Sequence, residues 1–254
     1  MDITNEIAIV TGAASGLGEA TARHLAAQGA RVGVLDFNIE QAQSVARDIG
    51  GIAVQLDVTD EDQVIAAIAT VRDHFGGAPR IAVNCAGIAN AARIVGREGK
   101  TAVPLFRKVI EVNLFGTYNV MTHAAAAMMD QDADTGGERG VIVNTSSAAY
   151  QDGQIGQSAY AASKGAVAAM CLPAAREMAR SGIRVVAIAP GLFGTPMMQA
   201  LPSETTAAIT ANIPFPDRLG HPSEFGQMVG DIVRNPYLNG TTIRLDGAVR
   251  LPPK

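Results

Sequence analysis

Short runs of β-branched and apolar residues alternate with segments of helical period along the whole chain. The runs are apolar throughout rather than alternating, as expected for strands that are covered on both faces. In one helical segment, the apolar positions between Val64 and Phe75 recur at intervals of four, three and four residues and form a single stripe. The alternation predicts a doubly wound α/β fold with a seven-stranded parallel sheet and helices on both faces. The predicted strands are Ile7–Val10, Arg31–Leu35, Ile52–Gln55, Ile81–Asn84, Val141–Asn144, Arg184–Ile188 and Thr242–Leu245.

No internal repeat or long linker divides the 254 residues, so we expect one domain over residues 1–254. Asp130–Gly140 is acidic and rich in glycine, and we interpret it as an exposed connection. Two longer irregular stretches, Ala89–Pro104 and Pro190–Pro222, each follow a predicted strand. Because open α/β sheets bind ligands at the carboxyl ends of their strands, these stretches are expected to build the site.

Composition narrows the function classes. Twenty Lys and Arg residues against 24 Asp and Glu give a net charge of −4, which disfavours binding to nucleic acid or to an anionic membrane. Aromatic residues make up 4% and Trp is absent, so stacking platforms for single strands are missing. Two cysteines provide no disulfide framework and no metal cluster. With no signal-peptide pattern and no apolar stretch of membrane length, we expect a cytoplasmic protein.

The first candidate site is a glycine-rich turn. The first predicted strand runs directly into Thr11–Gly18 (TGAASGLG), and a helical pattern follows. Glycines allow the backbone to turn tightly and to approach a pyrophosphate, which sits at the amino end of a helix. This placement predicts a dinucleotide site, although glycines also form ordinary turns. The residues expected to contact the cofactor here are Gly12, Ser15, Gly16, Leu17 and Gly18.

An acidic residue follows the second predicted strand at Asp36. A carboxylate at this place can accept hydrogen bonds from the adenosine ribose and repels a 2′-phosphate. Neither Ser15 nor Phe37 supplies the base that an NADP site would require. We therefore expect NAD as the cofactor, with Asp36 and Phe37 beside its ribose.

Tyr160 and Lys164 are four residues apart in an alanine-rich helical segment, so both lie on one face of a helix. Lowering a tyrosine pKa from ~10 to ~7 requires about 4 kcal/mol. One ammonium group ~4 Å away supplies that much at an effective dielectric constant of ~20. The pair is thus a candidate acid/base for interconverting a hydroxyl and a carbonyl, although alone such a pair is typical of a helix surface.

Taken in order, these motifs resemble the short-chain dehydrogenase/reductase family over essentially the whole chain. The matching features are TGxxxGxG, Asn-Cys-Ala-Gly at 84–87, Asn113, Ser147, YxxxK at 160–164 and Pro190–Gly191. The resemblance implies an NAD-binding half over about residues 1–150 and a catalytic and substrate-loop half over about 140–254. It makes Tyr160 the acid/base, with Lys164 lowering its pKa and holding the nicotinamide ribose. Ser147 would bind the reacting oxygen, and Asn113 would hold a relay water.

The same resemblance implies further cofactor contacts and a homotetramer. The small apolar residues around the helix Tyr160–Met178 support assembly, because one sheet cannot cover them all. The further residues expected at NAD are Asp57, Val58, Cys85, Ala86, Gly87, Pro190, Gly191, Phe193 and Thr195.

A closer likeness is to one subgroup, the type 2 3-hydroxyacyl-CoA dehydrogenases (also 17β-hydroxysteroid dehydrogenases of type 10). It rests on VNCAGIA, GQSAYAASKG, APGLFGTP, PFPDRLG and LNGTTIRLDGAVR. It implies oxidation of short or 2-methyl-branched 3-hydroxyacyl-CoA thioesters, as in fatty-acid β-oxidation or branched-chain amino-acid degradation. The alternatives are a hydroxysteroid dehydrogenase, a 3-oxoacyl-carrier-protein reductase and a non-catalytic NAD sensor. Besides Ser147, the expected substrate contacts are Gln154, Gln157, Met197 and Leu201.

Three further features of the sequence, an apolar run, a basic run and a histidine, do not identify a single role. Met197, Met198, Leu201 and Ile209 suit an adaptable apolar lid or the core. The basic run Arg93, Arg97 and Lys100 suits a solvated surface or a landing site for a CoA phosphate. His221 is a poor helix cap, but Pro222 and Glu224 still mark a helix start after it.

Overall fold

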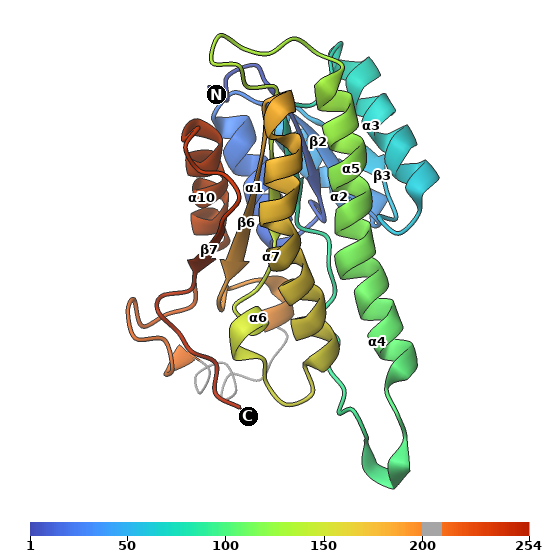
Figure 1. Cartoon of the computed structure of the whole chain (residues 1–254), viewed down its shortest axis with the longest axis vertical. Coiled ribbons are helices and arrows are strands. Elements are labelled where there is room, and N and C mark those ends of the chain that lie inside the picture. Colours follow the sequence, from blue (N-terminus) through green and yellow to red (C-terminus); the bar gives the residue numbers. More distant parts are fainter. Residues whose placement is uncertain (200–209, 254) are drawn as a thin grey trace.

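The structure is a computed structural model that describes residues 1–199 and 210–253. In this part of the chain, seven strands form one parallel sheet in the order β3-β2-β1-β4-β5-β6-β7 (Figure 1), which confirms the predicted fold class. Three strands keep their predicted bounds, and the other four are longer by one or two residues at one end or both. They are β1 (Ile7–Thr11), β2 (Arg31–Asp36), β3 (Ile52–Gln55), β4 (Ile81–Asn84), β5 (Gly140–Thr145), β6 (Ile183–Pro190) and β7 (Thr242–Leu245).

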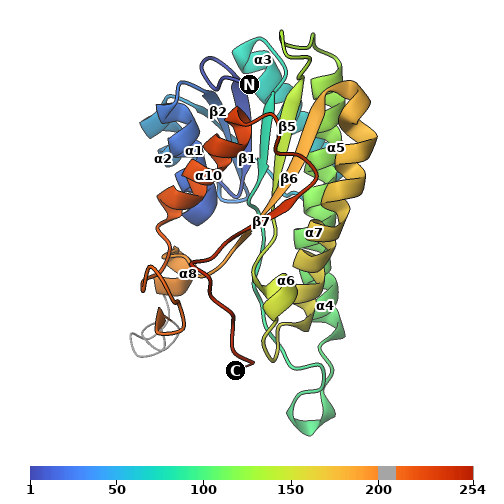
Figure 2. The ribbon, with the colours of Figure 1, turned by 60° about the vertical axis from the view of Figure 1, so that its left-hand side comes forward.

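Helices cover both faces of the sheet (Figure 2). One face packs against α1, α2 and α10, and the other against α3, α5 and α7. A π-helical turn, Glu111–Phe115, joins α4 to α5 in one long rod. The helices are α1 (Gly16–Ala27), α2 (Ile39–Ile49), α3 (Glu61–Phe75), α4 (Val103–Ile110), α5 (Gly116–Met129), α6 (Ala149–Asp152), α7 (Ser158–Met178), α8 (Pro196–Gln199) and α10 (Pro222–Arg234).

Strand side chains alternate between two cores. Ala8 and Val10 of β1 lie in the core under α1, α2 and α10, whereas Ile7 and Ile9 lie in the core under α3, α5 and α7. All four are buried, which is why the strand reads as apolar at every position.

The strand order reverses at β1, which pairs with β2 on one side and β4 on the other. At such a switch point the connections leave the sheet in opposite directions and open a crevice at the carboxyl ends. The glycine-rich turn after β1 and the segments after β4, β5 and β6 meet at this edge.

Two predicted irregular stretches contain local structure. In the first, Val95 and Thr101 form an isolated antiparallel bridge within an arm that extends away from the sheet (Figure 1), and α4 begins already at Val103. In the second, Pro190 still belongs to β6, and α8 follows. No helix in the described residues is long and apolar enough to cross a membrane.

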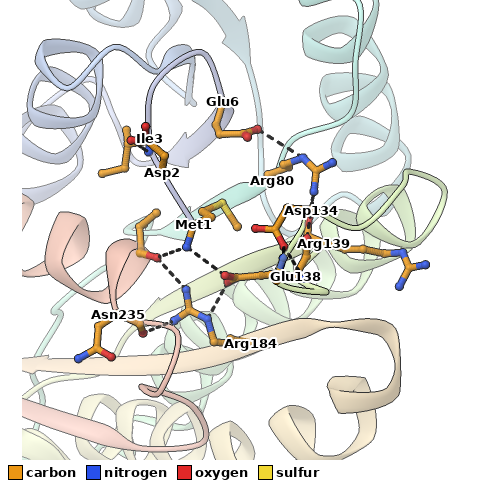
Figure 3. Close-up of polar contacts among 12 residues, drawn as sticks. Met1, Asp2, Ile3, Glu6, Arg80, Asp134, Glu138, Arg139, Arg184 and Asn235 are labelled. Atoms are coloured by element: carbon orange, nitrogen blue, oxygen red, sulfur yellow. Dashed lines mark hydrogen bonds and ion pairs between the residues drawn. The ribbon is translucent and has the colours of Figure 1, made fainter.

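The connection before β5 is largely exposed, as predicted, but the side chain of Glu138 in it is buried. Glu138 is only 9% exposed, and its Oε1 accepts a hydrogen bond from Nε of Arg184 on β6 at 2.7 Å. The ammonium group of Met1 donates to the other carboxylate oxygen (Figure 3). The partners are distant in sequence, so the local composition of Asp130–Gly140 gives no signal for this buried side chain.

Candidate active site

The backbone of the glycine-rich turn packs so closely against neighbouring backbone atoms that two of its positions have no room for a side chain. Gly12 has φ +63, and a Cβ there would lie 2.8 Å from the backbone of Ala86 after β4. A Cβ at Gly18 would lie 2.2 Å from the carbonyl oxygen of Gly12. Only glycine fits both places, and the turn presents backbone N–H groups at the start of α1. This cradle fits a pyrophosphate, in agreement with the expected dinucleotide site.

Asp36, at the end of β2, is fixed beside that turn. One carboxylate oxygen accepts from the backbone N–H of Ala14 at 2.9 Å, and the other accepts from Asn38 N at 2.9 Å. The ring of Phe37 is exposed. Asp36 therefore holds negative charge at the rim of the cradle, where an adenosine ribose would lie.

The remaining predicted residues of the cofactor half line the same edge. Val58 is buried, and Asp57 accepts hydrogen bonds from the backbone and hydroxyl of Thr59. Ala86 N donates to Thr11 Oγ1 at 3.2 Å, which joins the segment after β4 to the glycine turn. Burial raises the pKa of the Cys85 thiol to about 11, which favours the neutral thiol.

Two predicted cofactor residues follow β6, and the structure buries the side chain of one and places the other beside the glycine-rich turn. The ring of Phe193 is 6% exposed and packs edge-on against Phe225, with centroids 6.3 Å apart. Any contact with a cofactor would therefore come from its main chain. Thr195 lies against the glycine turn, because a Cβ at Gly16 would be 3.5 Å from its Cγ2.

Ser147 follows β5 at the carboxyl edge of the sheet and is 8% exposed. Its Oγ accepts from Ala149 N, the first residue of α6, at 3.2 Å. A side-chain hydrogen bond joins Ser147 to Tyr160 on α7. Strand β5 and helix α7 thus bring together the two hydroxyl groups to which the family resemblance assigns roles.

Tyr160 and Lys164 share one face of α7, but their pKa values do not shift as expected. Burial raises the pKa of Tyr160, which the hydrogen bond with Ser147 partly offsets, and burial lowers the pKa of Lys164 to about 8. The expected lowering of the tyrosine pKa by Lys164 is absent here. Lys164 Nζ lies 6.0 Å from the ring centroid and donates to Thr145 O at 2.7 Å. Both shifts favour the uncharged forms.

The end of β5 holds Lys164 from two sides. Its Nζ donates to the carbonyl of Thr145, and its own carbonyl accepts from Ser146 Oγ at 2.8 Å. Sequence analysis missed Ser146, whose only signal is a small polar residue next to Ser147 at the end of an apolar strand.

Asn113 lies in the π-helical turn and is fully buried. Its Oδ1 accepts from Ile88 N at 2.8 Å, and its Nδ2 donates to Ile88 O and to Ser163 Oγ. The amide group of Asn113 therefore binds protein partners, and these hydrogen bonds link α7 to the segment after β4. Both N–H donors of the Asn113 side chain are used by protein partners, and Ser163 is a second site residue that was not predicted from the sequence.

The predicted substrate residues differ in how well the structure places them. Gln154 and Gln157 bind each other, and Gln154 Nε2 also donates to Pro252 O at 3.0 Å. Their amide groups therefore brace the loop before α7. Met197 is part of α8, but its side chain, Leu201 and Ile209 lie outside the described residues.

The remaining polar residues form no metal centre. Within residues 1–199 and 210–253, no group of three or more His, Cys, Asp or Glu side chains could hold a metal ion. His221 precedes α10 as predicted, and Glu224 accepts from its backbone N–H at 2.7 Å.

Comparison with known proteins assigns the family. Residues 6–206 match the family described as short chain dehydrogenase. The chain is 48% identical to 3-hydroxyacyl-CoA dehydrogenase type-2 of Drosophila melanogaster, over 99% of this chain and 100% of the relative. It is 46% identical to the human protein of that name, over 97% and 96%. A crystal structure of 3-hydroxyacyl-CoA dehydrogenase type-2 from Mycobacterium avium superimposes with a TM-score of 0.92 at 43% identity, over 98% of both chains.

Proposed function

This chain belongs to the short-chain dehydrogenase family of oxidoreductases, and from that premise we propose that it is an NAD-dependent 3-hydroxyacyl-CoA dehydrogenase. The observation that carries the substrate class is identity of 46–48% over nearly the full length to relatives that bear this name. The family requires a nicotinamide cofactor, and the cradle at Gly12 and Gly18 fits its pyrophosphate.

The proposed reaction uses Tyr160 as the acid/base. In oxidation, the phenolate of Tyr160 accepts the proton of the C3 hydroxyl while Ser147 donates a hydrogen bond to the same oxygen. Lys164, held by Thr145, stabilises the phenolate with its positive charge. When bound, the nicotinamide supplies the acceptor for the hydride that leaves C3. The Ser147 hydroxyl beside Tyr160, and the buried Lys164 with its Nζ 6.0 Å from the Tyr160 ring centroid, support these assignments.

The preference for NAD follows from Asp36. Its carboxylate is fixed by Ala14 and Asn38 at the rim of the cradle, where the 2′-phosphate of NADP would be placed. Two negative charges at close range in a partly dry site cost several kcal/mol. Neither Ser15 nor Phe37 supplies a compensating base.

The arm after β4 is a candidate site for the nucleotide end of CoA. Arg93, Arg97 and Lys100 are all exposed, and Ala92 N, at the root of the arm, donates to Gly156 O before α7. The arm is thereby tied to the loop that leads to Tyr160. Exposed basic groups are also typical of a solvated surface, so a truncated substrate must distinguish the two roles.

A homotetramer is the proposed assembly. Large apolar side chains remain exposed on α4, the π-helical turn, α5 and α7, which lie next to one another (Figure 1). Exposed apolar surface of this kind often marks a protein–protein contact. The exposed members are Val103, Phe106, Phe115, Tyr118, Met129 and Leu172.

A cofactor and substrate panel tests the proposal. Acetoacetyl-CoA, its pantetheine-truncated analogue, a 3-oxoacyl-carrier protein and a ketosteroid are each reduced with NADH and with NADPH. We expect the highest kcat/KM for acetoacetyl-CoA with NADH. Better use of the carrier protein with NADPH, or of the steroid, would replace the proposed substrate. If the arm binds the nucleotide end of CoA, the KM of the truncated analogue should be higher than that of acetoacetyl-CoA.

A further inference from the structure

One partly buried arginine outside the catalytic motifs contacts several segments around the site. Arg244 lies on β7, and its side chain is 16% exposed. Nη2 donates to Asp152 Oδ2 at 2.7 Å, Nη1 donates to Gln151 Oε1 at 2.8 Å, and Nε donates to Asp246 Oδ2 at 2.6 Å. Nη2 also donates to the carbonyl of Val249 at 3.0 Å. All three guanidinium nitrogens are therefore used, in a planar fork that fixes its partners in direction as well as distance.

Two of these partners belong to α6, the short helix that starts beside Ser147. At its beginning, Ala149 N donates to Ser147 Oγ at 3.2 Å, and Tyr150 N donates to Ser147 O at 3.0 Å. At its end, Gln151 and Asp152 bind Arg244. A helix of four residues has little stability of its own, so its position depends on such contacts.

The other side of the fork holds the wall beside Pro190 and Gly191. Asp246 packs directly on Gly191, where an added Cβ would lie 2.6 Å from the Cβ of Asp246. Gly191 N donates to Leu245 O at 2.9 Å, and Ala148 N donates to Pro190 O at 2.8 Å. Through Asp152 and Asp246, the Arg244 side chain therefore connects the helix beside Ser147 to the segment at Gly191, where the nicotinamide is expected.

The segment beyond Val249 continues this contact to the loop before Tyr160. Gln154 Nε2 donates to Pro252 O at 3.0 Å, and Ile155 N donates to Pro253 O at 3.0 Å. The loop therefore lies between the residues that follow β7 and the root of the arm at Ala92.

We propose that Arg244 is a positioning residue that, together with residues 249–253, sets the placement of Ser147 and of the loop leading to Tyr160. Hydride transfer requires the reacting atoms to be held in close alignment, and a misplacement of about 1 Å can lower the rate by roughly 10²-fold. Arg244 itself does not touch the reacting atoms. Its loss should therefore lower kcat while leaving cofactor binding at Gly12 and Asp36 intact.

The test compares Arg244→Met, Arg244→Lys and Asp152→Asn with wild type. Arg23→Met is the matched control, because Arg23 also binds two carboxylates, at 2.9 and 2.8 Å, but on α1 and away from α6. Three quantities are measured: NADH affinity by fluorescence, hydrogen exchange over residues 148–161, and the kinetics of acetoacetyl-CoA reduction with the primary deuterium isotope effect from labelled NADH.

For Arg244→Met, we expect kcat to fall by about 10- to 100-fold. The NADH dissociation constant should stay within about threefold of wild type, exchange over residues 148–161 should rise, and the isotope effect on kcat should increase. Arg244→Lys keeps the charge without the fork, so intermediate values are expected. Arg23→Met should match wild type in all three.

Two results would overturn the proposal. One is a kcat for Arg244→Met within twofold of wild type without faster exchange over residues 148–161. The other is exchange that rises evenly over the whole sheet, which would assign Arg244 to general stability. If Arg244→Met does not fold, Asp152→Asn and Arg244→Lys decide by the same criteria. The kinetic arm rests on the proposed function. If wild type does not reduce acetoacetyl-CoA, that function fails, whereas the exchange measurement still decides the role of Arg244.

Discussion

At the catalytic pair, burial acts on two neighbouring groups in opposite directions. It raises the pKa of Tyr160 and lowers that of Lys164 to about 8, so both groups are shifted toward their uncharged forms. The phenolate that oxidation requires is therefore costly unless the ammonium group is charged and close. In the structure Lys164 donates to Thr145 O, and Tyr160 has a hydrogen bond with Ser147.

This arrangement predicts opposite pH dependences for the two directions of the reaction. Oxidation requires deprotonated Tyr160, so its kcat/KM should rise with pH, whereas reduction requires the protonated phenol and should fall with pH. Both profiles report apparent pKa values of the Tyr160–Lys164 pair rather than of either residue. Steady-state rates in both directions over one buffer series measure this. Parallel profiles in the two directions would contradict the assignment.

The buried ion pair between Arg184 on β6 and Glu138 should contribute to the stability of the fold. Arg184 binds Glu138 and donates to four backbone carbonyls, of which three belong to Ile232, Val233 and Asn235 at the end of α10 (Figure 3). Removing one partner of a buried ion pair typically costs 3–5 kcal/mol, roughly. We expect Arg184→Met to lose about that much in urea unfolding. The exposed control Arg23→Met should lose less than about 1 kcal/mol, and equal losses would show that burial of the Arg184 pair is not decisive.

At the scale of elements, the packing of α1 on α10 contains a titratable group. The Nε2 atom of His24 is buried and has no hydrogen-bond partner within the described structure, because α10 presents Gly226 and Gly230 to it. Burial, aided by the charge of Arg234, lowers the pKa of His24 below 6.5. In the unfolded chain this imidazole takes up a proton more readily than in the fold.

The stability that neutral His24 contributes is fully present above pH 6.5 and is lost as the pH falls from there toward the lower pKa of the folded state. Thermal unfolding between neutral and mildly acidic pH should therefore show a steeper decline of Tm in wild type than in His24→Gln, which cannot be protonated. Identical slopes would mean that His24 does not contribute to the acid sensitivity.

The elements also show what local sequence encodes. β3, β4 and β7 keep their predicted bounds because their apolar runs end at residues that leave the sheet. Tyr160 and Lys164 come together because their spacing is that of one helical turn. Other contacts depend on partners far along the chain and have no local signal. Examples are the inward ring of Phe193, the Arg184–Glu138 pair and the contacts of Gln154 with Pro252.

For the whole molecule, the apolar outer side of α4, α5 and α7 predicts self-association. Light scattering at micromolar protein should give the mass of a tetramer. Replacing Phe106 and Tyr118, which are 42% and 53% exposed, with Ser should shift the mass toward smaller species while the fold is retained. A monomer mass for wild type would contradict the proposed assembly.

The central claim, that this fold uses Tyr160 to interconvert 3-hydroxyacyl-CoA and 3-oxoacyl-CoA with NAD(H), is tested most directly by one comparison. Reduction of acetoacetyl-CoA by NADH is measured for wild type and for Tyr160→Phe, with NADH binding measured on the same samples. We predict efficient turnover by wild type and a loss of at least ~10²-fold in Tyr160→Phe with unchanged NADH affinity. Turnover by Tyr160→Phe close to that of wild type would contradict the account.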